Sequence, residues 1–179
     1  MIYTIGHGAR SIDRFIALLQ GAGVRRLVDI RTAPGSRKHP QFGKDTLAAA
    51  LEQHGIAYGW EKDLGGFRKP GPDSRNTSLR NAGFRGYADH METEEFRAAR
   101  DRLIAASPGI PTACMCAESL WWRCHRRLLS DALTVAGCEV LHIMDGGRQV
   151  PHRLTGSARV ENGSLVYDVP EGQQELSAE

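Results

Sequence analysis

Residues 2–30 read IYTIGHGARSIDRFIALLQGAGVRRLVDI and predict a strand, a helix and a second strand. The apolar run Ile2–Ile5 ends at a glycine-rich turn, and Ser11 is a favourable N-cap for the helix that follows. That helix carries apolar side chains at helical spacing, namely Ile12, Phe15, Ile16 and Leu19. Glycines end the helix, and a second apolar run, Leu27–Ile30, completes a βαβ unit.

The same alternation extends along the chain and predicts an α/β fold. Further strands are expected at 56–60, 112–116 and 139–144, and longer helices at 44–54, after Thr93 and up to Ala136. A short helix is expected at Gly86–Met91, and Asn162-Gly163 indicates a hairpin. We therefore predict a single three-layer domain over residues 1–170. It has a mainly parallel sheet of about five strands with helices on both faces, a short C-terminal hairpin, and a flexible tail at 171–179.

The composition limits the classes of function. The 179 residues carry a formal net charge of +2, which by itself does not argue for nucleic-acid binding. No apolar run approaches the roughly 20 residues of a membrane span, and no signal-like segment is seen, so we expect a cytoplasmic protein without a membrane partner. The four cysteines, at 114, 116, 124 and 138, are crowded into one segment, which favours reduced thiols over a disulfide framework.

Polar side chains follow each expected strand at its carboxyl end. In a parallel sheet these ends open onto one edge, where ligands bind in a crevice. We therefore expect one crevice to collect His7, Arg31, Glu61, Lys62, Cys116, Glu118 and Asp145. Two of these have a simpler alternative, because His7 can be a locally bonded turn residue and Arg31 can pair with Asp29.

The richest stretch is CMCAESLWWRCHRR, residues 114–127. Cys124 is expected in the first turn of the following helix, where the helix dipole and neighbouring arginines would lower its pKa towards the nucleophilic thiolate. Cys116 is its possible partner. Glu118 and His125 are candidates for moving protons, and Glu118 is alternatively an acceptor that orients His125 or Arg126.

Two binding alternatives arise from the same region. Cys116, Glu118, Cys124 and His125 have suitable types for metal ligands, but a paired Cys-x-x-Cys is missing, so we expect no metal cofactor. Trp121 and Trp122 are able to stack on a base, although such a pair more often packs against its own domain. A long loop is expected at 64–85, and its part from Arg68 to Arg85 holds five basic residues against Asp73 alone. This part is either a solvated surface or an anion site.

Several stretches together resemble one known family. They are TIGH at 4–7, VDIR at 28–31 with Pro34 and Ser36-Arg37, PQF at 40–42, LGG at 64–66 with RKP at 68–70, NAGFRGY at 81–87, and MCAE at 115–118 followed by CHR at 124–126. They are similar to the Domain of Unknown Function 488 family, whose members often have serine where this chain has Gly8. The resemblance implies a compact α/β protein with a polar crevice and no particular reaction or cofactor. It groups His7, Arg31, Arg68, Tyr87, Cys116, Glu118, Cys124, His125 and Arg126 as one site.

The leading hypothesis from the sequence is an enzyme that uses a thiolate of Cys124 or Cys116 on an anionic nucleotide or nucleic-acid substrate. Arg31, Arg68 and Arg126 would hold the anion, and Trp122 would stack on a ring. The first alternative is a non-catalytic protein that binds or senses nucleotides or nucleic acid. The second is a metal-binding protein that uses the segment from Cys116 to His125. The sequence does not specify the oligomeric state.

Overall fold

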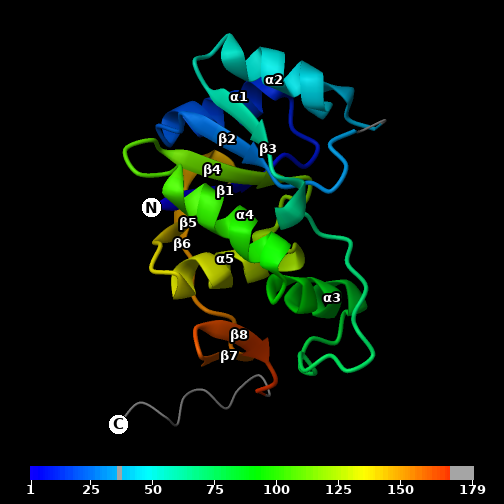
Figure 1. Cartoon of the computed structure of the whole chain (residues 1–179). Helices are drawn as coiled ribbons and strands as arrows, with labels where there is room; N and C mark the ends of the chain where they lie inside the picture. Colours follow the sequence, from blue (N-terminus) through cyan, green and yellow to red (C-terminus); the bar gives the residue numbers. More distant parts are fainter. Residues whose placement is uncertain (36–37, 170–179) are drawn as a thin grey trace.

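A six-stranded sheet forms the centre of the fold in the computed structural model, which describes residues 1–35 and 38–169 (Figure 1). The strands lie in the order β3-β2-β4-β1-β5-β6, and β6 pairs antiparallel to β5 while the others pair in parallel. They are β1 (Ile2–Gly6), β2 (Arg26–Asp29), β3 (Ala57–Trp60), β4 (Thr112–Cys116), β5 (Val140–Ile143) and β6 (Gln149–Pro151). The hairpin β7 (Ala158–Glu161) and β8 (Ser164–Tyr167) is a separate antiparallel sheet. The predicted α/β fold is confirmed, with β6 as an unexpected sixth strand. The expected tail at 171–179, and Ser36 and Arg37, lie outside the described residues.

Helices cover both faces of the sheet (Figure 1). They are α1 (Ile12–Gly21), α2 (Lys44–Glu52), α3 (Ala82–Met91), α4 (Glu94–Ala105) and α5 (Arg126–Val135). Residues of β4 point alternately to the two faces: Ala113 and Met115 pack with α1 and α2, whereas Cys114 and Cys116 pack with α3, α4 and α5. Among the described residues, no helix is both long and apolar enough to cross a membrane.

One helix begins earlier than the sequence predicts. The short helix expected at Gly86–Met91 is α3, and it starts at Ala82 because the side chain of Asn81 accepts a hydrogen bond from the backbone N–H of Phe84 at 3.2 Å. The long loop therefore ends at Asn81 rather than at Arg85.

The order of the strands opens a crevice between β1 and β4. The connection from β1 passes through α1 and skips β4 to reach β2, whereas the connection from β4 passes through α5 and skips β1 to reach β5. These two crossovers leave neighbouring strands in opposite directions, and their helices cover opposite faces. A doubly wound sheet binds ligands outside such a point, at the carboxyl ends of its strands.

The turn after β1 must come very close to the loop after β4. The backbone N–H groups of His7 and Gly8 donate to the carbonyls of Cys116 and Ala117 at 3.0 and 2.9 Å. A Cβ atom on Gly6 would lie 1.8 Å from the backbone carbonyl oxygen of Glu118. Only glycine at position 6 allows the two segments to meet.

We expect the substitution Gly6→Ala to destabilise the protein by about 3 kcal/mol, the upper end for overpacking, because a backbone carbonyl cannot move aside as a side chain can. Urea unfolding would measure it. Gly21→Ala is the matched control: a Cβ atom added there would meet no packed neighbour within 4 Å, so alanine in α1 should leave stability unchanged or raise it by up to about 1 kcal/mol. Equal stabilities for the two variants would mean that the loop after β4 can rearrange freely.

Candidate functional site

A cavity of about 490 Å³ lies at the carboxyl ends of β1, β2 and β4, and we call it the strand-end cavity. It brings together six of the predicted site residues, which are His7, Arg31, Cys116, Glu118, Cys124 and His125. Its volume falls within the range of about 300–1,000 Å³ that is typical of small-molecule sites.

The two predicted thiols meet at the base of this cavity. The Sγ atoms of Cys116 and Cys124 lie 2.8 Å apart, and both residues are buried. Cys116 ends β4, but the expected place of Cys124 in a helix is wrong. Cys124 follows a 3₁₀ helix (Trp121–Arg123) with extended backbone, and His125 is the N-cap of α5. The local pattern of apolar and basic residues did not reveal this break.

Arg126, the first residue of α5, contacts the thiol pair from the side away from the cavity. It is 1% exposed and does not line the cavity. Its Nε donates to Cys116 Sγ at 3.1 Å, and its Nη2 donates to the backbone carbonyls of Glu118 and Ser119. No carboxylate pairs with Arg126 among the described residues, so the thiol pair is the nearest source of negative charge. Burial alone would lower the pKa of Arg126, yet the two sulfurs keep that pKa raised and the guanidinium charged.

The pKa values of the two thiols are shifted in opposite directions. The hydrogen bond from Cys116 holds the pKa of Cys124 well below its usual value, with His125 and Arg126 adding to the effect against burial. Burial raises the pKa of Cys116 well above its usual value, and the neighbouring Cys124 sulfur raises it further. These opposite directions favour ionisation of Cys124 before Cys116. By contrast, burial raises the pKa of Cys114 to about 12, and this thiol belongs to the core.

A buried chain of hydrogen bonds leads away from Arg126, and sequence reasoning missed it. Arg126 Nη1 lies 3.4 Å from Thr4 Oγ1, which is 2.7 Å from His142 Nδ1. His142 Nε2 is 3.0 Å from His152 Nδ1, and His152 Nε2 is 2.8 Å from Asp131 Oδ1. Burial lowers the pKa of His142 to about 3, so this ring is neutral at pH 7.

The hydrogen bonds in this chain are compatible with donation in a single direction, from Arg126 towards Asp131. If the Nε2–H of His152 donates a hydrogen bond to the carboxylate of Asp131, its Nδ1 accepts from His142, whose own Nδ1 then accepts from the hydroxyl of Thr4. The hydroxyl oxygen is left to accept from Arg126. A buried cation and a buried carboxylate are thereby connected through aligned dipoles. The available signal in the sequence was polar residues at core positions, because His142 lies inside an apolar strand and Asp131 lies beside the apolar face of its helix.

The tryptophans lie on the same side as this chain and outside the cavity. Trp121 stacks on His142 with ring centroids 4.0 Å apart, which supports the ordinary packing role. Trp122 is 44% exposed and touches the edge of Trp121. The predicted ring-binding residue Trp122 does not line the strand-end cavity.

His7 lines the strand-end cavity and has one unused hydrogen-bond acceptor. Its Nδ1 lies 2.8 Å from the carbonyl oxygen of Gly8 and must carry the proton, while its ring stacks on Phe42. Burial lowers the pKa of His7 to about 4, so Nε2 is a bare acceptor at pH 7. Neither His7 Nε2 nor His125 Nε2, both buried atoms, has a hydrogen-bond partner among the described residues.

Arg31 combines the two roles that the sequence left open. Its Nε and Nη2 form a bidentate pair with Asp29, at 2.9 and 2.5 Å, and Tyr58 also donates to that carboxylate. Nη1 makes no hydrogen bond within the described part of the chain, and the side chain lines the cavity. Asp29 thus fixes the guanidinium and leaves one edge available to an anion.

Arg68 and Tyr87 do not line the cavity but hold one of its walls. Arg68 Nε donates to the carbonyl of Gly65 at 3.2 Å, and the Tyr87 hydroxyl donates to the carbonyl of Leu64 at 2.9 Å. They fix the segment that contributes Gly66 and Phe67 to the cavity. Sequence reasoning missed Phe67, although a large apolar residue after two glycines in a polar loop was a visible signal.

Two other residues expected in the crevice, Glu61 and Asp145, do not line the strand-end cavity. Glu61 follows the outer strand β3 and pairs with Arg102, and Asp145 follows β5 and pairs with Arg10. Among the described residues, no group of three or more Cys, His, Asp or Glu side chains is placed to hold a metal ion. The described residues therefore offer no set of ligands for the metal-binding alternative.

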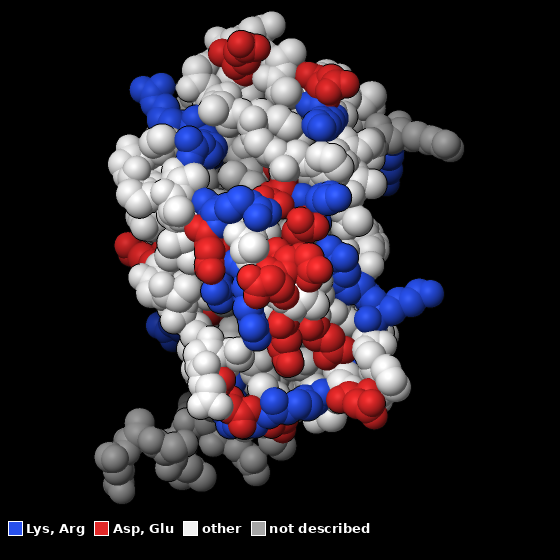
Figure 2. Space-filling view, viewed as in Figure 1, with Lys and Arg blue, Asp and Glu red and all other residues white. Residues whose placement is uncertain are grey.

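The charge distribution on the visible face is mixed. Figure 2 shows acidic and basic side chains interleaved over α4, whose sequence contains both kinds. In the basic loop, Arg75 pairs with Glu161, and Arg85, which lies in α3, donates to the backbone carbonyl of Leu79. This face does not carry a continuous basic track of the kind that binds nucleic acid.

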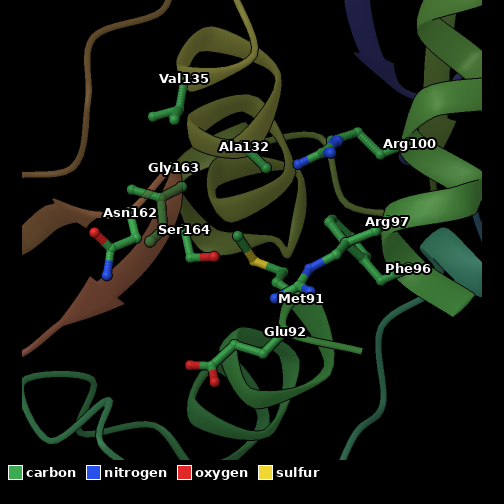
Figure 3. A pocket seen from close by; sticks show the side chains of 11 residues that line it. Met91, Glu92, Phe96, Arg97, Arg100, Ala132, Val135, Asn162, Gly163 and Ser164 are labelled. Atoms are coloured by element: carbon green, nitrogen blue, oxygen red, sulfur yellow. The ribbon is translucent and has the colours of Figure 1, made fainter. Parts of the chain in front are cut away.

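A second cavity, of about 390 Å³, lies where α3, α4 and α5 meet the turn of the β7–β8 hairpin. Figure 3 shows Arg97 and Arg100 reaching towards it from α4, opposite Asn162 and Ser164 of the hairpin. None of the predicted site residues lines it, and neither does any cysteine or histidine. The reactive groups are therefore concentrated in the strand-end cavity.

The comparisons with known proteins give a family and no reaction. The family model described as Domain of unknown function DUF488 matches residues 11–133. No curated protein and no solved structure matches the chain. The matched range includes both thiols and Arg126 but ends before His142 and His152.

We expect Thr4→Val to slow the alkylation of Cys124 in acidic solution, in the pH range where the wild-type thiolate begins to be protonated. Loss of the hydroxyl removes one acceptor from Arg126, weakens its hold on the thiols, and so raises the pKa of Cys124. Iodoacetamide labelling of the folded protein, followed by mass spectrometry, would measure the rate.

Thr112→Val is the matched control, because the Thr112 hydroxyl donates to the carbonyl of Ile110 at the other end of β4. Thr4→Val removes two buried hydrogen bonds, with Arg126 and His142, and Thr112→Val removes one, so Thr4→Val should lose more stability, at about 1–3 kcal/mol for each bond. Equal slowing of alkylation in both variants would show that the buried chain of hydrogen bonds does not affect the pKa of Cys124.

Proposed function

Because the chain belongs to the family described as Domain of unknown function DUF488, whose description specifies no chemistry, we propose a function from the geometry. The protein is an enzyme that uses the Cys124 thiolate as a nucleophile on an anionic substrate bound in the strand-end cavity. The observation that carries this proposal is the pair of sulfurs, 2.8 Å apart at the base of the cavity and held by the buried Arg126.

The proposed reaction begins with attack of Cys124 Sγ on an electrophilic carbon of the substrate. A sulfur–carbon bond forms, and the bond to the leaving group breaks with its electron pair. His125 or Glu118 supplies a proton to the leaving group, and water later displaces the sulfur to release product. His125 suits this role because its Nδ1 is 3.5 Å from Cys124 Sγ while Nε2 has no partner among the described residues.

Cationic groups support an anionic substrate. Arg31 and Arg123 both line the cavity, against the single carboxylate of Glu118. Arg126 supplies positive charge from below, where low exposure limits screening by water. We assign Arg126 to holding the thiol pair through its hydrogen bond to Cys116, and Arg31 to binding the substrate. The free state of all the described cysteines supports a reducing compartment, and we place the enzyme in the cytoplasm.

A non-catalytic nucleotide or nucleic-acid sensor is the second candidate. The observation in its favour is that Cys116 and Cys124 are only 2% and 6% exposed, which restricts the approach of a substrate to either sulfur. In this alternative the same arginines bind the ligand, and the thiols pack or respond to oxidation.

The nucleophile is tested by the pH dependence of iodoacetamide labelling at Cys124. Since the pKa of Cys124 is lowered, labelling should remain fast as the pH falls below about 8.5, the value for an ordinary thiol, and should slow only in more acidic solution. Half-buried Cys138 in the same sample serves as an internal reference site for reagent decay.

An ordinary titration near pH ~8.5 at Cys124 would refute the nucleophile. Ligand binding that survives Cys124→Ser, in a protein whose Cys124 labels no faster than a model thiol, would favour the sensor.

A further inference from the structure

Phe67 stands at the rim of the strand-end cavity in an unusual state. Its side chain is 96% exposed, although phenylalanine is normally among the more buried residues. Its φ angle is 58°, in the left-handed region that non-glycine residues seldom occupy. A single exposed apolar residue is ordinary, but an exposed ring in a strained backbone at the mouth of a reactive cavity points to a function.

The surrounding contacts fix this conformation. The Thr32 hydroxyl donates to the carbonyl of Gly66 at 2.7 Å. A Cβ atom on Gly66 would lie 2.9 Å from His125 Nδ1, and one on Gly65 would lie 2.7 Å from Thr32 Oγ1. The two glycines therefore pack closely against Thr32 and the His125 ring. Phe67 follows them directly and is exposed to solvent.

The wall of the cavity is rich in flat rings. Besides Phe67, it includes His7, His39, Phe84 and His125. Offset stacking on such rings is favourable for any flat π-system, and a heterocycle also offers ring N–H donors. His7 also lines this cavity, and its buried Nε2 has no hydrogen-bond partner among the described residues.

We propose that Phe67 is a stacking platform for the substrate, and that the substrate is a flat heterocyclic ring bearing an anionic group, of the size of a mononucleotide. The ring stacks on Phe67 at the rim, and the anion faces Arg31 and Arg123. This inference rests on the proposed function only for the location of the site, because stacking on Phe67 does not require a reactive thiol.

Isothermal titration calorimetry on the full chain tests the proposal with the four common nucleoside 5′-monophosphates, ribose 5-phosphate and inorganic phosphate. The best nucleotide should bind at least about tenfold more tightly than ribose 5-phosphate, which has the anion without the ring. Phe67→Ala should weaken nucleotide binding by about 5- to 100-fold, and Phe67→Trp should preserve it. Neither variant should change the binding of ribose 5-phosphate.

Ile110→Ala is the control for removing an exposed apolar side chain, because Ile110 is 37% exposed and precedes the opposite end of β4. It should leave every affinity unchanged. The proposal is overturned if no nucleotide binds better than ribose 5-phosphate, or if Phe67→Ala weakens both ligands equally. A single-stranded oligonucleotide that binds more tightly than any mononucleotide would overturn the assignment to a free mononucleotide. Failure of the thiolate would be seen separately, in the labelling of Cys124, and would leave these affinities untouched.

Discussion

The buried guanidinium of Arg126 is the constraint on which the site depends. A cation with 1% exposure is costly unless its donors are satisfied, and here they are directed at a sulfur, two loop carbonyls and the hydroxyl of Thr4. Each contact positions something that the chemistry needs. The carbonyls fix the loop after β4, the sulfur contact orients the thiol pair, and Thr4 connects the charge to β1. Gly6 makes the arrangement possible because only a residue without a side chain leaves room for that loop.

The topology of the sheet determines where the strand-end cavity lies. Crossovers that leave β1 and β4 in opposite directions open space at their carboxyl ends, and β2 adds Arg31 from the other side of β4. The alternation of side chains along β4 then places Cys114 and Cys116 on the same face, but only the second reaches the end of the strand. Two chemically identical residues thus receive different roles from their distance to the edge of the sheet.

The sequence was sufficient for the features that depend on local pattern and on the geometry of parallel sheets. It predicted the alternation of strands and helices, and also the convergence of His7, Arg31 and Cys116, because all three lie at or just after the carboxyl ends of strands. It misplaced Cys124, since the break before α5 is set by tertiary contacts of Arg126 and not by helix propensity. Arg68 and Tyr87 were grouped with the site but act behind its wall. The chain from Thr4 to Asp131 joins residues up to 148 positions apart in the numbering, His152 and Thr4 being the extremes, so no local pattern contains it.

The buried chain also links the site to the end of the described fold. The Tyr167 hydroxyl, from β8, donates to Asp131 Oδ2 at 2.9 Å, and His152 lies just after β6. Ribosomes make a protein from its N-terminus, so Cys116 and Cys124 are made well before these partners. A nascent chain that has reached α5 carries both thiols without the residues that complete the electrostatic environment of Arg126. The full set of buried contacts that runs from Arg126 to Asp131 and Tyr167 is therefore available only after β8 has been made.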